Sequence, residues 1–280
     1  MVDRPVTAGL VVVSVPHAGR IYPPEILAES RVAPEVLERL EDRWCDRIAS
    51  GAVAAGATLV QALWARAVAD CNRGEGQMAP GEVAAALRSQ FSVPGRKERA
   101  GLGVVPTRLA DVGALWSRPI DRDSLDWRLE SLHRPYNAAL ADALAEARDR
   151  FGHAVLIDLH SMPPIPAGQS GHGARIVIGD RFGASSGDWL IDLAMKQAGR
   201  LAIPVSRNQP YAGGHIVRTH GKPGRAVHAI QIEIDRSLYL RVDHTPDDER
   251  IGALSRWFAG LVAAAGSGES LPDTQPLAAE

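Results

Sequence analysis

Strand-like and helical segments alternate along this chain, and the alternation restricts the possible fold more than any other feature. Runs rich in Val and Ile, bounded by Gly or Pro, occur at 10–15, 57–63, 154–159, 174–179 and 226–234. Apolar residues recur with helical periodicity at about 34–55, 122–150, 187–200 and 247–265. This order of elements predicts an α/β fold with a mostly parallel central sheet.

The predicted elements form one continuous series without an interdomain linker or an internal repeat, which favours a single domain over residues 1–265. Within it, the Gly- and Pro-rich segment 74–119 is predicted to be a long excursion from the sheet. Pro135 is expected to kink or split the helix at 122–150. The tail 266–280 has the composition of a disordered segment.

Charge and cysteine content exclude several classes of protein. With 280 residues and a net charge of −2, the chain gives no electrostatic reason to bind nucleic acid or an anionic membrane. The apolar run Leu10–Val15 is too short to span a bilayer and lacks the flanks of a signal peptide. Two cysteines do not form a disulfide framework, so we expect a soluble protein of the reducing cytoplasm.

Histidines follow two of the predicted strands, in SVPHAG and in VLIDLHSMPP. In open α/β sheets, ligands bind beyond the carboxyl ends of the strands. His17 and His160 therefore either line a cleft or act as turn and cap residues. Asp158, two residues before His160, points to the same side, and a carboxylate in that position can orient the imidazole of a metal ligand.

A carboxylate within the last strand has no ordinary structural explanation. Glu233 lies between two isoleucines, where a buried charge is costly without a partner or a task. After the second strand come Arg66, Asn72 and Arg73, which suit a carboxylate ligand but also suit ordinary ion pairs.

Asp42 and Asp46 are four residues apart in the first predicted helix, on the side opposite the stripe formed by Leu40, Trp44 and Ile48. Helical periodicity thus favours a solvated acidic face for both aspartates.

Two loop motifs allow more than one interpretation. The pair Gly213–Gly214, followed by Arg218 and His220, permits close approach of a ligand but also suits a surface turn. GASSG at 183–187 matches the G-x-S-x-G nucleophile elbow, which would make Ser185 the nucleophile of a metal-independent serine hydrolase. That motif requires a turn directly from strand to helix, whereas three residues intervene here.

Taken together, several stretches resemble the N-formylglutamate amidohydrolase family. They are SVPHAGRIYP, EDRWCDRI, ARAVADCNR, RPYN, VLIDLHSMP and NQPYAGGHIVRTHGKPGRAVHAIQIEIDRSLYL, in the order expected of the family between about residues 10 and 240. The resemblance implies a three-layer α/β/α sandwich of the zinc-peptidase-like (phosphorylase/hydrolase-like) kind, with a mixed, mostly parallel sheet. It also implies one catalytic divalent metal ion, zinc in the first instance.

The resemblance assigns roles to the candidate residues. It implies metal ligation by His17, His160 and an acidic residue, either Asp42 or, as the alternative, Asp46. Glu233 is then the general base and acid for a zinc-activated water, Arg66 polarises the scissile carbonyl, and Asp158 orients His160. Substrate contacts are implied for Asn72, Arg73, Gly213, Gly214, Arg218 and His220.

The implied reaction is hydrolysis of N-formyl-L-glutamate, or a related N-formyl or N-acyl amino acid, to formate and glutamate, a step that the family uses in histidine breakdown. The chain departs from the family pattern at Asn137, where a histidine is common, and in GASSGD, which lacks the usual cysteine. Besides the serine hydrolase, a second alternative is a non-catalytic carboxylate-binding protein of the same fold.

Overall fold

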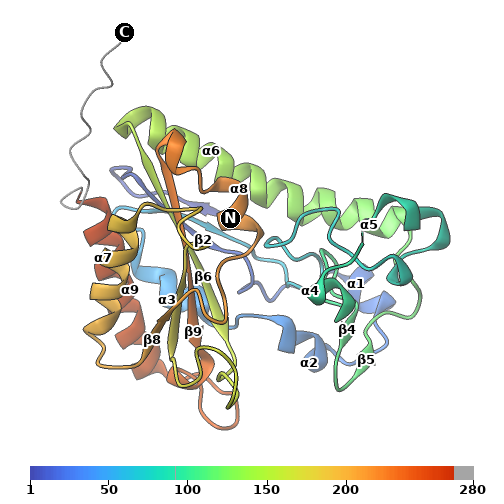
Figure 1. The fold of residues 1–280 in the computed structure, drawn as a ribbon. Helices are drawn as coiled ribbons and strands as arrows, with labels where there is room; N and C mark the ends of the chain where they lie inside the picture. Colours follow the sequence, from blue (N-terminus) through green and yellow to red (C-terminus); the bar gives the residue numbers. More distant parts are fainter. Residues whose placement is uncertain (92, 268–280) are drawn as a thin grey trace.

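A computed structural model describes residues 1–91 and 93–267, and a seven-stranded sheet forms its centre (Figure 1). The strands are β1 Val2–Asp3, β2 Val11–Val15, β3 Thr58–Gln61, β6 Ala154–Met162, β7 Ile176–Gly179, β8 Val205–Arg207 and β9 Val227–Asp235. They lie in the order β1-β3-β2-β6-β9-β7-β8. Only the β1–β3 and β7–β9 pairs within this sheet are antiparallel. The prediction of a mixed, mostly parallel sheet is confirmed.

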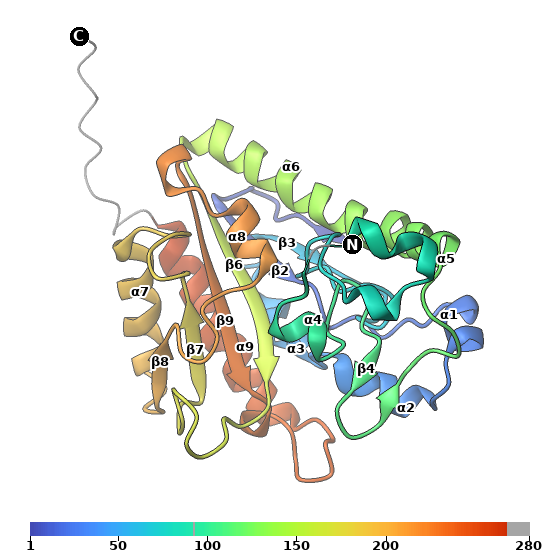
Figure 2. The same ribbon diagram turned by 45° about the vertical axis from the view of Figure 1, so that its right-hand side comes forward.

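Helices cover both faces of the sheet and complete the predicted three-layer α/β/α sandwich (Figures 1 and 2). On one face lie α3 Cys45–Ile48, α7 Asp188–Gly199 and α9 Asp248–Gly266. On the other lie α6 Arg134–Phe151 and α8 His215–His220. Alternate residues of each strand enter the two cores: in β6, Ile157 packs toward α7 and α9, and Leu156 packs toward α6.

The helix predicted at 122–150 is interrupted where Pro135 requires it. It consists of α5 Arg122–Arg128, a π-helical turn over Leu129–His133, and α6, which has Pro135 in its first turn. Proline has no amide N–H and is tolerated at that position, while the wider π turn accommodates its ring.

The continuous helix predicted at 34–55 is wrong. The segment breaks into α2 Pro34–Leu37, a 3₁₀ turn Glu38–Leu40, α3 and a 3₁₀ turn Ala49–Gly51. Trp44 has φ of +71°, and the Asp42 amide donates to the His17 carbonyl at 2.9 Å instead of to the preceding turn. Asp42 and Asp46 therefore do not share a helical face, which removes the basis for expecting a solvated acidic stripe.

The excursion at 74–119 adds no strand to the main sheet and packs over the core below α6. It contains 3₁₀ turns at Pro80–Glu82 and Ala85–Gln90, helix α4 Arg96–Arg99, and the antiparallel pair β4 Arg108–Leu109 and β5 Gly113–Ala114. The remaining elements are α1 Pro24–Glu29 and 3₁₀ turns at Pro223–Arg225 and Arg236–Leu238.

None of the helices in the described part of the chain combines the length and hydrophobicity needed to cross a bilayer. Of the predicted tail 266–280, Gly266 still belongs to α9, and residues 268–280 lie outside the described part.

Candidate active site

Three buried side chains converge on one point near the carboxyl ends of β2 and β6. The Nδ1 atoms of His17 and His160 are 3.2 Å apart, and Asp42 Oδ2 lies 3.2 Å from the first and 3.1 Å from the second. His17 follows β2 after the turn at Pro16, His160 is on β6, and Asp42 lies in the break before α3. All three are at most 3% exposed.

This triangle fits a metal ion better than it fits a hydrogen-bonded cluster. The Nε2 atoms of both histidines face carboxylates, Asp70 Oδ1 at 2.7 Å from His17 and Asp158 Oδ2 at 2.8 Å from His160. With Nε2–H donating to those carboxylates, both Nδ1 lone pairs and the Asp42 oxygen point at one another, an arrangement that a cation stabilises. The atoms within this group are also spaced as ligands of one tetrahedral zinc would be, roughly 3.3 Å apart for bonds of about 2.0 Å.

Carboxylates behind the two histidines fix their orientation. Asp158 is completely buried, and its other oxygen accepts a hydrogen bond from Ser14 Oγ at 2.7 Å. Asp70, to which no role was assigned from the sequence, faces His17. It also accepts hydrogen bonds from the Arg66 guanidinium and from the backbone N–H of Asn72. Burial opposes ionisation of Asp70, but Arg66, His17 and Arg73 together outweigh it and hold the pKa of Asp70 well below its usual range.

Asp46 lies apart from the triangle. Its carboxylate forms a two-point ion pair with Arg20, with distances of 2.6 and 3.0 Å. The structure therefore leaves Asp42 as the acidic member of the group.

Arg236 holds Asp42 in place and was missed in the sequence. Its Nη2 donates to Asp42 Oδ1 at 3.0 Å and to the Glu41 carbonyl at 2.7 Å, and its Nε donates to Ser161 Oγ at 3.0 Å. Ser161 in turn donates to Asp42 Oδ1 at 3.2 Å. With Oδ1 occupied in this way, Oδ2 faces the two histidines. The only signal in the sequence is that Arg236 directly follows β9.

Glu233 lies beside His160 in the neighbouring strand. The two residues are register partners in parallel strands, so both side chains leave the sheet on the face that Leu156 also occupies. Gln231 Nε2 donates to Glu233 Oε1 at 2.8 Å. Burial raises the pKa of Glu233 to about 7, against the opposing effect of the nearby His160 imidazole, and this value suits a general base.

Asn72 is committed to contacts within the protein. Its Oδ1 accepts from the Ile216 amide at 2.8 Å, and its Nδ2 lies 3.1 Å from His160 Nε2. A Cβ at Gly214 would stand 2.3 Å from the Asn72 amide group. Gly214 thus permits the start of α8 to pack directly on Asn72.

The two arginines predicted to contact substrate differ in how many of their guanidinium nitrogens are hydrogen-bonded within the protein. Arg66 uses Nε and Nη2 for Asp70, at 3.0 and 2.7 Å, and Nη1 for the Leu40 carbonyl at 3.3 Å. Arg73 donates from Nε to the Leu102 carbonyl at 3.1 Å and from Nη1 to the Asn72 carbonyl at 2.8 Å. Among the described residues, none accepts a hydrogen bond from Arg73 Nη2.

Helix α6 contacts the segment that carries Asn72 and Arg73 through Asn137, one of the positions where the chain departs from the family pattern. Asn137 Nδ2 donates to the carbonyls of Cys71 and His133 at 3.3 and 3.0 Å. Its other amide atom, Oδ1, is buried and has no hydrogen-bond partner in the part of the chain described.

Arg218 and His220 of α8 do not touch the triangle through any hydrogen bond. Arg218 is exposed, and its Nη2 lies 3.0 Å from His215 Nδ1. His220 Nε2 is buried, and no residue within 1–91 and 93–267 hydrogen-bonds to it.

Ser185 is not placed as a nucleophile. Its side chain is 1% exposed, and Oγ donates to the Ala229 carbonyl at 2.9 Å. Within the described part of the chain, Ser185 Oγ hydrogen-bonds to no histidine or carboxylate that could act as the base an activated serine requires, which disfavours the serine-hydrolase alternative.

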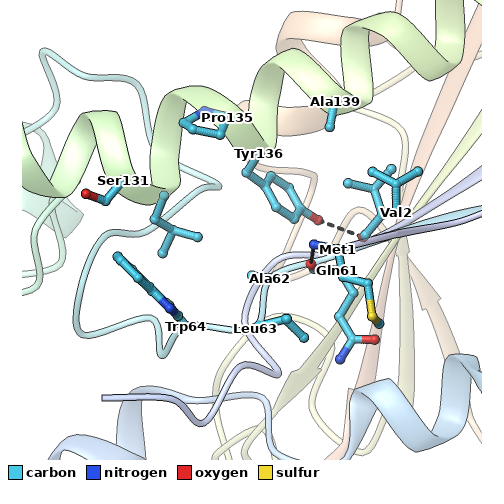
Figure 3. Close-up of a pocket in the computed structure, with 12 residues that line it drawn as sticks. Met1, Val2, Gln61, Ala62, Leu63, Trp64, Ser131, Pro135, Tyr136 and Ala139 are labelled. Carbon is cyan, nitrogen blue, oxygen red and sulfur yellow. Dashed lines mark hydrogen bonds between the residues drawn. The ribbon is translucent and has the colours of Figure 1, made fainter. Parts of the chain in front are cut away.

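The apolar cavity drawn in Figure 3 is a separate feature of about 310 Å³, lined by residues of the β1 and β3 region and of the π turn. Tyr136 points into it, and its hydroxyl lies 2.8 Å from Ser14 Oγ and 3.2 Å from the Val60 carbonyl oxygen. Because Ser14 also bonds Asp158, a chain of hydrogen bonds joins the wall of this cavity to His160.

Comparison with known proteins identifies the family. The model of the N-formylglutamate amidohydrolase family matches residues 10–240. The chain belongs to this family. It is 27% identical over 241 residues to an N-formylglutamate deformylase of Pseudomonas aeruginosa, covering 82% of each protein. A deformylase of Pseudomonas putida is 34% identical over 114 residues, 40% of this chain and 43% of that protein.

Solved structures agree with the family assignment. The crystal structure of N-formylglutamate amidohydrolase from Ralstonia eutropha superposes with a TM-score of 0.88 at 28% identity, covering 95% of this chain and 96% of the other. A gene product of Agrobacterium tumefaciens, 20% identical with a TM-score of 0.69 over 96% and 94% of the two chains, shares the fold. The predicted family and the predicted amide-hydrolysing class of enzyme are confirmed.

Proposed function

We propose that this protein hydrolyses N-formyl-L-glutamate, or a closely related N-formyl or N-acyl amino acid, to formate and the free amino acid. The observation that carries the proposal is the buried triangle of His17, Asp42 and His160 with Glu233 beside it. The N-formylglutamate deformylases of Pseudomonas and the N-formylglutamate amidohydrolase of Ralstonia suggest the substrate. The two buried free cysteines agree with a reducing, cytoplasmic location.

In this proposal His17, Asp42 and His160 hold one divalent metal ion, zinc. Two imidazoles and one carboxylate form a donor set that zinc accepts while leaving a position open for substrate. When bound, the ion supplies Lewis acidity, which lowers the pKa of water and polarises a carbonyl group.

Glu233 performs the proton transfers. With a pKa near 7 it is partly ionised at neutral pH, so it can take a proton from the attacking water and return it to the leaving amide nitrogen. Gln231 holds one of its oxygens and leaves the other available. Arg66, fixed by Asp70, adds positive charge where the oxyanion develops.

Positive charge around the site complements a substrate with two carboxylates. Arg73 Nη2 donates no hydrogen bond to residues 1–91 or 93–267, which suits it to one substrate carboxylate. Lys97 of α4 is close enough to Glu233 for each charge to affect the pKa of the other. Its side chain reaches solvent, yet desolvation by the surrounding protein lowers the pKa of Lys97 to about 8. We assign Lys97 to the second carboxylate, which gives the excursion at 74–119 a role in substrate selection.

The test is a formate-release assay over a panel of N-formyl and N-acetyl amino acids, with and without chelator. We expect N-formylglutamate to be turned over fastest and the chelator to abolish turnover. Full activity without metal would contradict the metal-dependent mechanism. Binding of N-formylglutamate without any formate release would instead support a carboxylate-binding protein that lacks catalysis.

A further inference from the structure

A second pocket, which the proposed reaction does not use, is lined by four basic residues. It has a volume of about 590 Å³ and is formed by the segment after β7 and the segment from α8 to the start of β9. Its basic side chains are Arg181, Arg218, Lys222 and Arg225, and its lining contains no carboxylate.

These cations are not neutralised within the protein. None has a carboxylate oxygen within 4.0 Å among residues 1–91 and 93–267, although many other arginines of the chain form ion pairs, including Arg175 and Arg207 on neighbouring elements. Asp180, which precedes Arg181, is held by Arg207 and Asn208. The chain as a whole carries a net charge of −2, so overall basicity does not explain the cluster.

Backbone geometry positions the pocket walls. Arg181 has φ of +55°, and a Cβ at Gly213 would lie 3.1 Å from its Cγ. Gly221 likewise leaves room for Ser185, whose Cβ would stand 2.6 Å from a Cβ at that position. Lys222 Nζ donates to the Arg218 carbonyl at 3.0 Å, which links two of the four cations.

The Lys222 and Arg225 part of the pocket lies toward the opposite end of β9 from the proposed catalytic group, whereas Arg181 lies two residues after Gly179, which pairs with Gln231 of β9. Lys222 and Arg225 precede Val227, the first residue of β9, whereas Glu233 is near its carboxyl end. Glu233 is six residue steps along the extended strand from Val227, a span of roughly 20 Å.

We propose that this pocket binds a small molecule bearing two or more phosphate groups. Four positive charges exceed what a dicarboxylate neutralises, whereas two phosphate groups carry about −3 to −4 at neutral pH. Three of the four cations are arginines, whose guanidinium groups bind phosphate through paired hydrogen bonds. The open pocket has room for a compact ligand of this kind.

Calorimetric titration of the metal-loaded protein with pyrophosphate at low ionic strength tests the proposal. Wild type is compared with R181Q/R225Q and with a charge-matched control, K196Q/R256Q, which removes two exposed cations from α7 and α9. We expect R181Q/R225Q to bind at least about tenfold more weakly and the control to stay within about twofold of wild type. Polyphosphates also bind metal ions, but all three proteins share the same metal residues, so that contribution cancels.

Equal binding by wild type and R181Q/R225Q would overturn the proposal, as would no measurable binding by wild type. Anionic vesicles that bind through the same arginines while pyrophosphate does not would also overturn it, in favour of a membrane surface. Competition between N-formylglutamate and pyrophosphate that is lost in R181Q/R225Q would show that the pocket belongs to the substrate site. Formate release is measured separately, so failure of this proposal leaves the proposed reaction untouched.

Discussion

His160 on β6 and Glu233 on β9 are directly paired in parallel register, and this pairing sets the proposed base beside the proposed metal ligand. Neither residue depends on a flexible loop for its position. Asp158 and Gln231 form the next pair on the same face, and each bonds the functional residue two positions later in its own strand. The rigid centre of the sheet therefore fixes both the ligand and the base.

Replacement of Glu233 by Gln is expected to lower kcat by about 10²–10⁴-fold, since the amide cannot accept the proton of the attacking water. Metal content and thermal unfolding should remain near wild type, because Gln fills the same space without a charge. Formate release and metal analysis on the same preparation check both parts. Substantial activity in Glu233→Gln would assign the base to another residue.

The pH dependence of kcat/KM should show an acidic limb from Glu233. Burial raises its pKa to about 7, so protonation below that value removes the base and activity rises as the pH increases through it. A cation held at His160 lowers this pKa, which places the limb of the loaded enzyme at or below about 7. A pH profile measured with metal in excess tests this, and an acidic limb centred clearly above 7 would contradict it.

Replacement of Arg236 by Gln is expected to weaken metal affinity by about 10–100-fold, the range observed when groups that orient a metal ligand are removed. Asp42 Oδ1 loses its charged donor and the carboxylate is no longer held toward the histidines. Arg175→Gln is the matched control, since Arg175 also pairs with an aspartate beside the end of β9 but does not contact Asp42. Competition with a chromophoric chelator measures both variants; equal affinities would remove Arg236 from the positioning of Asp42.

Replacement of Gly214 by Ala is expected to reduce the free energy of unfolding by about 1–3 kcal/mol and to impair activity. The added Cβ would stand 2.3 Å from the amide group of buried Asn72, which has little room to move. Gly76→Ala is the control, because a Cβ there meets no atom within 4 Å. Denaturant unfolding of the two variants should separate them, with Gly76→Ala close to wild type.

Local patterns predicted the sheet well because its strands are buried runs of Val and Ile with clear boundaries. Strand β6 nevertheless extends to Met162 and ends only before Pro163, so His160 and Ser161 lie within the strand and not beyond it. The short strands β1 and β8 escaped prediction, since they are two and three residues long and pair at the edges.

Within the site, periodicity failed where tertiary contacts decide the backbone. Helical periodicity predicts a solvated face for Asp42, but its backbone amide donates to the His17 carbonyl and no helix includes Asp42. Asp70 contacts His17, 53 positions away, and Arg236 contacts Asp42, 194 positions away, and no spacing rule connects residues so far apart in the sequence. Such contacts between distant segments are visible only once the fold brings them together.

The excursion at 74–119 contributes no strand to the main sheet, yet it supplies the carbonyl of Leu102 to Arg73 and carries Lys97. None of its described residues pairs with β6 or β9. With the role proposed for Lys97, part of the substrate preference would reside in a segment outside the sheet, separate from the paired strands that carry His160 and Glu233.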